Sequence, residues 1–113
     1  MNEFEDLKQR LLEFAGDRDW EQFHSPKNLA AALSVEASEL LEIFMWLKSD
    51  QPLTPTQLQN VRDEMGDIYL YLLRLADVLN IDLLEATREK FAKVEEKYTL
   101  EKSLELTRSL THT

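Results

Sequence analysis

The chain has 113 residues, no cysteine, two glycines and three prolines, and its 13 basic and 22 acidic residues give a formal charge of −9. This length suits one domain, and the absence of cysteine excludes disulfides, thiolate metal sites and a cysteine nucleophile. The acidic balance argues against a nucleic-acid partner, which normally needs a basic face. No basic and apolar leader opens the chain and no apolar run approaches the roughly 18 residues of a membrane helix, so we expect a cytoplasmic protein without a membrane partner.

Two helices are predicted in the first half of the chain. The first spans about residues 3–16, where apolar residues recur on one side and a glycine ends the pattern. A connector over residues 17–25 follows. Ser25 stands directly before a proline, as is typical of an N-cap and the first helical position, and it opens a second helix that runs to about Lys48.

Two more helices are predicted in the second half. Thr54 also precedes a proline and opens a third helix, which continues to about Leu79. Asp82 can cap a fourth helix that ends near Tyr98. Since helix formers dominate and turn residues are few, the sequence predicts an all-α fold, a four-helix bundle.

The domain is expected to cover residues 1–98. The remaining tail, residues 99–113, still carries several leucines, so it is expected to be either helical or partly disordered.

Glu36 interrupts the apolar stripe of the second predicted helix. Alternating steps of four and three residues place it on one helical face with five aliphatic residues, Leu29, Leu33, Leu40, Ile43 and Leu47. Glu39 lies beside it, one turn further on. Burying two like charges is unfavourable unless a cation or hydrogen-bonding partners neutralise them. The stripe therefore predicts a positive group bound at this position.

The third predicted helix carries a companion stripe of Glu64, Asp67 and Tyr71, next to its apolar seam. If the second and third helices pack antiparallel, as their short linker suggests, four carboxylates converge at their contact. Carboxylate oxygens suit magnesium, with manganese as the alternative, because water and substrate phosphates can take the remaining coordination positions.

Two other interpretations of these carboxylates stay open. They could lie on a solvated helix face or pair with a lysine or arginine, since acidic pairs at this spacing are common in so acidic a chain. A di-iron bundle is the other competitor, but it normally takes histidine from E-x-x-H motifs. Neither His24 nor His112 occupies such a motif, so magnesium is favoured over iron.

Three long segments resemble a known family. They read D-W-E-Q-F-H-S-P-K-N at residues 19–28, L-S-V-E-A-S-E-L-L-E-I-F-M-W at residues 33–46, and D-E-M-G-D-I-Y-L-Y-L at residues 63–72. They are similar to the all-alpha nucleoside triphosphate pyrophosphatases, specifically the MazG-like branch that includes dCTP pyrophosphatases. The resemblance implies a MazG-like bundle completed by homo-oligomerisation.

By this resemblance the chain is a magnesium-dependent hydrolase of the bond between the α- and β-phosphates. Its substrate is a (d)NTP, with dCTP or a related or modified dNTP expected, and its products are a monophosphate and pyrophosphate. The resemblance assigns the metal and catalytic roles to Glu36, Glu39, Glu64 and Asp67, which the stripes also single out. Glu39 is one candidate for positioning the attacking water. The implied purpose is removal of noncanonical or surplus deoxynucleotides.

The resemblance also implies substrate contacts. Around the nucleobase it places Trp20, His24, Trp46 and Tyr71, and aromatic faces can stack on any base while an imidazole or hydroxyl reads its edge. Without the resemblance, the aromatic residues would be interpreted as core packing and His24 as an exposed or capping residue. Asn28 is a weaker candidate, at a helix N-terminus that favours anions.

Four residues near the end of the fourth predicted helix are candidates to hold the triphosphate, namely Lys90, Lys93, Lys97 and Tyr98. Family members commonly have asparagine where this chain has Val94, and arginine where it has Lys97, which removes a polar contact and bidentate phosphate geometry. The alternative is that these lysines pair with neighbouring glutamates on a solvated helix.

The chain is expected to associate with itself. Several apolar residues lie beyond the main helical seams: Phe44, Met45, Trp46, Leu70, Leu73 and Leu83. Surplus apolar surface usually marks an interface, and the resemblance implies dimers that often pair into tetramers. Two rival functions remain, a superfamily relative acting on another nucleotide such as dUTP or phosphoribosyl-ATP, and a noncatalytic helical oligomeric interaction module.

Overall fold

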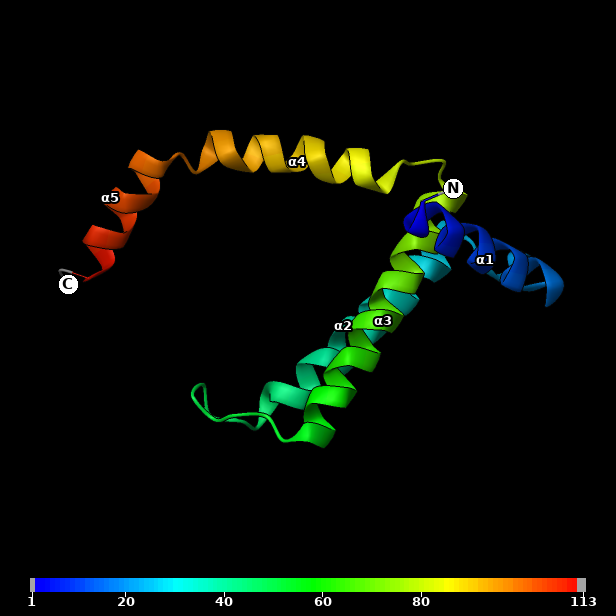
Figure 1. Ribbon diagram of the computed structural model, residues 1–113, viewed down its shortest axis with the longest axis horizontal. Coiled ribbons are helices and arrows are strands. Elements are labelled where there is room, and N and C mark those ends of the chain that lie inside the picture. The colour runs from blue at the N-terminus through cyan, green and yellow to red at the C-terminus, as the bar shows by residue number, and fades with distance from the viewer. Residues whose placement is uncertain (1, 112–113) are drawn as a thin grey trace. The chain divides into compact units, whose positions relative to one another are not determined.

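The computed structural model describes residues 2–111, which fold into five α-helices and one 3-10 helix and contain no strand (Figure 1). The prediction of an all-α fold is confirmed. His112 lies outside the described residues. The chain divides into two compact units, one that ends at Ile81 and one that begins at Asp82. That residues 1–98 form a single domain stays a prediction.

The first unit contains α1 (Glu3–Asp17), the 3-10 helix η1 (Trp20–Phe23), α2 (Pro26–Met45) and α3 (Pro55–Val78). Local hydrogen bonds explain where the helices begin. At the start of α2 the Ser25 hydroxyl accepts from the Asn28 backbone N–H. At the start of α3, Thr54 and Gln57 form a reciprocal capping box. Both predicted cap-and-proline starts are confirmed.

The segment between α1 and α2 is more ordered than a simple connector. Asp19 has a φ of 53°, in the left-handed region that aspartate tolerates better than most residues, and it stands directly before η1. The short helix η1 follows, and the Asn28 side chain donates from Nδ2 to the Phe23 carbonyl oxygen. This bond ties η1 to the first turn of α2.

The ends of α2 and α3 differ slightly from the predicted ends. Helix α2 stops at Met45, three residues before the expected Lys48, and hydrogen bonds between Lys48 and Gln51 form a turn in the loop that follows. Helix α3 ends in a Schellman motif. Asn80 has a φ of 55°, and the Ile81 N–H donates to the Ala76 carbonyl oxygen at 2.8 Å.

Helices α2 and α3 lie side by side and antiparallel, joined by the loop over residues 46–54 (Figure 1). Helix α1 packs against α3. The buried apolar residues are Ala15, Leu29, Leu73 and Ala76. They lie where the beginning of α2, the end of α3 and α1 meet. Leu73, which the sequence interpretation assigned to surplus apolar surface, is in fact only 1 % exposed and belongs to this core.

The second unit contains α4 (Leu83–Lys97) and α5 (Leu100–Thr111). The Asp82 side chain accepts from the Glu85 backbone N–H at 3.0 Å, as expected for the cap of the fourth helix. Residues 100–111 of the tail are helical. No helix in the described part of the chain is long and apolar enough to cross a membrane.

Candidate active site

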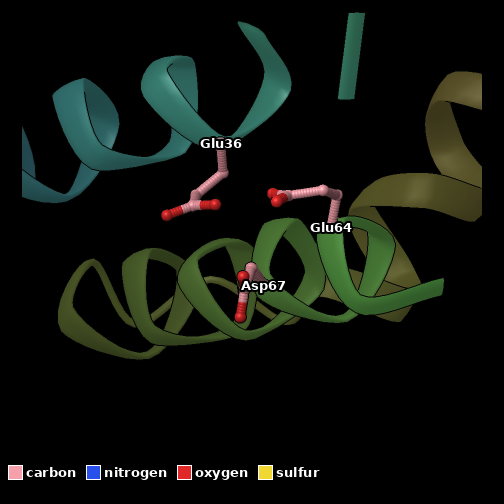
Figure 2. Close-up of side chains that lie close together, drawn as sticks. All are labelled: Glu36, Glu64 and Asp67. Atoms are coloured by element: carbon pink, nitrogen blue, oxygen red, sulfur yellow. The ribbon is translucent and has the colours of Figure 1, made fainter. Parts of the chain in front are cut away.

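Three of the predicted carboxylates meet between α2 and α3. Glu36 comes from α2, and Glu64 and Asp67 come from α3, where they are one turn apart. Each offers an oxygen that lies within 4.8 Å of the oxygens of the other two. Glu36 and Glu64 are half-buried and point toward one another, whereas Asp67 is exposed (Figure 2). The antiparallel pairing of the two helices brings this acidic cluster together.

Nothing in the described protein neutralises the acidic cluster. The Oε2 atoms of Glu36 and Glu64 are buried and accept no hydrogen bond. The ion pairs within residues 2–111 involve Lys8, Arg74 and Asp77, and none reaches the cluster. Buried carboxylate oxygens without a donor are unfavourable. This arrangement therefore fits a bound cation better than an ion pair with lysine or arginine.

The environment shifts the titration of both glutamates. Burial, together with the neighbouring carboxylates Glu64, Glu39 and Asp67, raises the pKa of Glu36 from 4.5 to about 7. Burial, and the negative charges of Glu39 and Asp67, also raise the pKa of Glu64. Both glutamates therefore resist ionisation, chiefly because burial disfavours their charged forms. A divalent cation reverses this effect by stabilising the ionised forms.

Glu39 lies one turn after Glu36 on α2 and is half-buried. It is not one of the three carboxylates that converge within 4.8 Å, but its charge contributes to the raised pKa of Glu36. It therefore stands beside the acidic cluster. Its assignment as a fourth metal ligand stays a prediction.

A cavity of about 240 Å³ adjoins the acidic cluster, with Asp67 common to both. Three of the residues predicted to contact a nucleobase line it, namely Trp20, His24 and Tyr71. The other lining residues come from α1 and α3: Leu11, Phe14, Ala15, Leu70 and Arg74. We call this cavity the aromatic pocket. In it, the aromatic and imidazole rings lie next to a carboxylate cluster that suits a cation.

Aromatic contacts fix one wall of the aromatic pocket. Trp20 meets Phe14 edge to face, with ring centroids 5.4 Å apart and an angle of 75° between the planes. The guanidinium of Arg18 lies 3.5 Å from the centre of the Phe14 ring. Trp20 is nevertheless 43 % exposed. Packing within the described residues therefore leaves part of the Trp20 ring accessible.

Two predicted substrate residues of the first unit lie outside the aromatic pocket. Trp46 ends α2, is 88 % exposed and does not line the pocket. His24 precedes the other end of α2, and a helix of 20 residues is about 30 Å long. Asn28 is exposed, and its side chain is already bonded to η1. Trp46 and His24 thus stand at opposite ends of α2, and the prediction that both contact one nucleobase stays a prediction.

Helix α4 of the second unit carries the predicted triphosphate contacts Lys90, Lys93 and Lys97, and Tyr98 caps its end. All four are exposed. The Lys97 ammonium lies 5.3 Å from the centre of the Tyr98 ring. No ion pair among the described residues joins these lysines to neighbouring glutamates. Their role with a triphosphate stays a prediction.

The sequence interpretation named none of five lining residues of the aromatic pocket as part of a site: Leu11, Phe14, Ala15, Leu70 and Arg74. Phe14 looked like ordinary apolar surface of the first helix. Arg74 carried a usable signal, because it is a lone charge inside the apolar run Leu70–Ala76. The same reasoning that singled out Glu36 in its stripe applies to it.

The MazG-like family matches residues 31–112 of this sequence, a range that includes the whole acidic cluster. The chain belongs to the MazG-like family. It is 39 % identical over 90 residues to dCTP pyrophosphatase 1 from Homo sapiens, which covers 76 % of this chain and 53 % of that protein. It is 41 % identical over 86 residues to dCTP pyrophosphatase 1 from Bos taurus, which covers 73 % of this chain and 51 % of that protein.

The chain thus spans about half the length of these curated relatives. Among solved structures, a pyrophosphatase from Archaeoglobus fulgidus resembles it with a TM-score of 0.77 and 38 % sequence identity. That likeness covers 88 % of this chain and 94 % of the other. The MazG-like resemblance found in the sequence motifs is confirmed.

The raised pKa of Glu36 predicts a pH-dependent stability in the absence of metal. Between pH 4.5 and about 7 the folded protein holds a proton on Glu36 that the unfolded chain has released, so this residue's contribution to the free energy of unfolding is lost as pH rises. In EDTA, we expect Glu36→Gln to raise the Tm more at pH 8 than at pH 5. Thermal unfolding of both proteins across this range measures the difference.

The Tm of the wild type must be compared with that of the variant because His24 also contributes to the pH dependence. Its lowered pKa makes the free energy of unfolding rise with pH, which is opposite to the effect of Glu36. Glu42 is an exposed glutamate of the same helix, so Glu42→Gln is the matched control. Its Tm should vary with pH as that of the wild type does. Equal pH profiles for the wild type and Glu36→Gln would contradict the prediction.

Proposed function

We propose that this chain is a divalent-metal-dependent nucleotide pyrophosphohydrolase. It cleaves the α–β phosphate bond of a (d)NTP, preferably dCTP or a related modified dNTP, to a monophosphate and pyrophosphate. The observation that carries this proposal is the unneutralised acidic cluster beside an aromatic pocket, with Asp67 common to both. The similar proteins named dCTP pyrophosphatase 1 and the archaeal pyrophosphatase support it.

The donors of the acidic cluster fit magnesium, with manganese as the alternative. Glu36, Glu64 and Asp67 offer hard carboxylate oxygens, and the two buried Oε2 atoms lack any protein donor. Glu39, beside them, completes the proposed ligand set. When bound, the cation supplies neutralisation of phosphate charge and a lowered pKa for a coordinated water.

The protein side chains hold the substrate for an in-line attack. Trp20 and Tyr71 stack against the nucleobase in the aromatic pocket, which directs the phosphates toward Asp67 and the rest of the acidic cluster. Glu39 stands outside the group of three converging carboxylates. We assign it the task of orienting the attacking water and accepting its proton.

The proposal includes a homo-oligomer in the cytoplasm that removes noncanonical or surplus deoxynucleotides. Apolar side chains remain exposed on α2 and α3: Leu41, Phe44, Met45, Leu58 and Met65. We call these five residues the hairpin surface. Exposed apolar area of this extent favours an interface. Trp46, exposed beside them, would then lie near a neighbouring copy rather than in its own chain's pocket.

Activity should depend on Glu36 and not on the acidity of its helix in general. We expect Glu36→Gln to lower the rate of pyrophosphate release from dCTP and magnesium by about 100-fold or more, because the charge that attracts the cation is lost. The matched control Glu42→Gln should stay within about twofold of the wild type. A continuous pyrophosphate assay measures both.

Circular dichroism and light scattering would establish that both variants keep the helical fold and the assembly of the wild type. Unchanged turnover in a folded Glu36→Gln protein would contradict the proposed site. A wild type that hydrolyses none of a panel of nucleoside triphosphates would favour the noncatalytic interaction module instead.

The homo-oligomer can be tested by its mass. At micromolar concentration, light scattering should give at least twice the chain mass of 13.3 kDa. Leu41→Glu introduces a charge into the hairpin surface and should lower the mass, whereas Asn60→Glu on an exposed polar position of α3 should not. A wild type of one chain mass would contradict association.

A further inference from the structure

Arg74 is the buried charged residue among the described residues, with 6 % of its surface exposed. It lies in the last part of α3 and lines the aromatic pocket together with His24. Burying a guanidinium is unfavourable unless its donors are satisfied. Its hydrogen bonds therefore indicate what the residue is used for.

Two hydrogen bonds fix the guanidinium from opposite sides. Its Nε donates to Nδ1 of His24 at 3.1 Å, and its Nη1 donates to Oδ2 of Asp77 at 3.2 Å. Asp77 is held in turn by Lys8 of α1, whose Nζ lies 3.7 Å from Oδ1. Because the guanidinium is planar and rigid, anchoring one edge on Asp77 determines where Nε points.

The bond to His24 determines which imidazole nitrogen carries the proton. Arginine only donates hydrogen bonds, so Nδ1 of His24 must accept, and the neutral ring carries its proton on Nε2. A second proton on Nδ1 would face the Arg74 N–H. Burial and the positive charge of Arg74 lower the pKa of His24, and the charge of Glu21 offsets this only partly.

We propose that Arg74 is a positioning residue for substrate recognition: it holds His24 so that its Nε2–H donates to an acceptor atom of the nucleobase in the aromatic pocket. This inference rests on the proposed function, because the base is part of that substrate. The remaining titratable or charged groups that line the pocket are Asp67 and Tyr71 of α3, while α1 contributes only apolar side chains. His24 is thus the pocket's imidazole donor, and Arg74 sets its direction.

The arrangement separates recognition from catalysis. Arg74 and His24 hold the base, while the acidic cluster, whose α3 members lie about two to three turns earlier, holds the cation. Losing the guanidinium should therefore weaken substrate binding and leave the chemical step nearly unchanged. If Arg74 had only a structural role, its loss would lower the stability of the protein and would not raise KM selectively while kcat stayed the same.

Nitrogen-15 NMR of the histidine side chains in the wild type tests the geometry without any substitution of Arg74. We expect a neutral His24 at pH 7.5, protonated on Nε2, with its signals assigned by their loss in His24→Phe. A ring protonated on Nδ1 would overturn the inference. This measurement tests the tautomer that the Arg74–His24 bond requires, whether or not the protein turns over dCTP.

Steady-state kinetics with dCTP and magnesium test the function of the bond. Arg74→Gln should raise KM by about tenfold and change kcat by less than about threefold, because a poorly placed donor no longer meets the base. Arg74→Lys should resemble Arg74→Gln, since an ammonium cannot reproduce the rigid fork. Arg62→Gln, an exposed arginine of the same helix, is the matched control and should behave as wild type.

A double-mutant cycle tests whether Arg74 affects KM through His24. In the His24→Phe background, Arg74→Gln should raise KM no further. Additive effects of the two substitutions, or an unchanged KM in a folded Arg74→Gln protein, would overturn this inference alone.

If Arg74→Gln fails to fold, the cycle is run with Asp77→Asn, which loosens the guanidinium and should give the same coupling to His24. A wild type without pyrophosphate release would overturn the proposed function, and this inference with it.

Discussion

Glu36 and Glu64 each place a carboxylate oxygen between α2 and α3, where water does not reach it and no protein donor meets it. Mutual repulsion and burial oppose their ionisation, as the raised pKa of Glu36, about 7, reflects. A chain without function would gain stability by replacing such a pair with apolar residues. Such a pair is reasonable where a divalent cation neutralises its negative charge, and the proposed catalysis depends on that cation.

In the proposed function, the rest of the first unit positions the substrate relative to this cluster. The antiparallel pairing of α2 and α3 brings the carboxylates together, and the turn that begins at Asp19 delivers Trp20 and His24 to the aromatic pocket at the end of the same pair. Asp67 joins the two regions. We propose that the rigid helices set the separation between the base and the phosphates, while the hydrogen bond from Arg74 orients the imidazole of His24.

Helix starts, the all-α fold and the acidic cluster could be predicted because each depends on local chemistry or on helical periodicity. Ser25 and Thr54 are caps, and Glu36 is a charge within an apolar stripe. Contacts that depend on tertiary packing could not be predicted in this way. Trp46 shares an aromatic character with Trp20 but lies at the far end of α2, and the bond between Arg74 and His24 joins residues 50 positions apart.

The central claim is that the acidic cluster supports metal-dependent cleavage between the α- and β-phosphates. Phosphorus NMR of the products formed from dCTP, with magnesium and again with EDTA, tests it most directly. Our account predicts dCMP and pyrophosphate, formed only with magnesium. Formation of a diphosphate and orthophosphate, or equal turnover in EDTA, would contradict it.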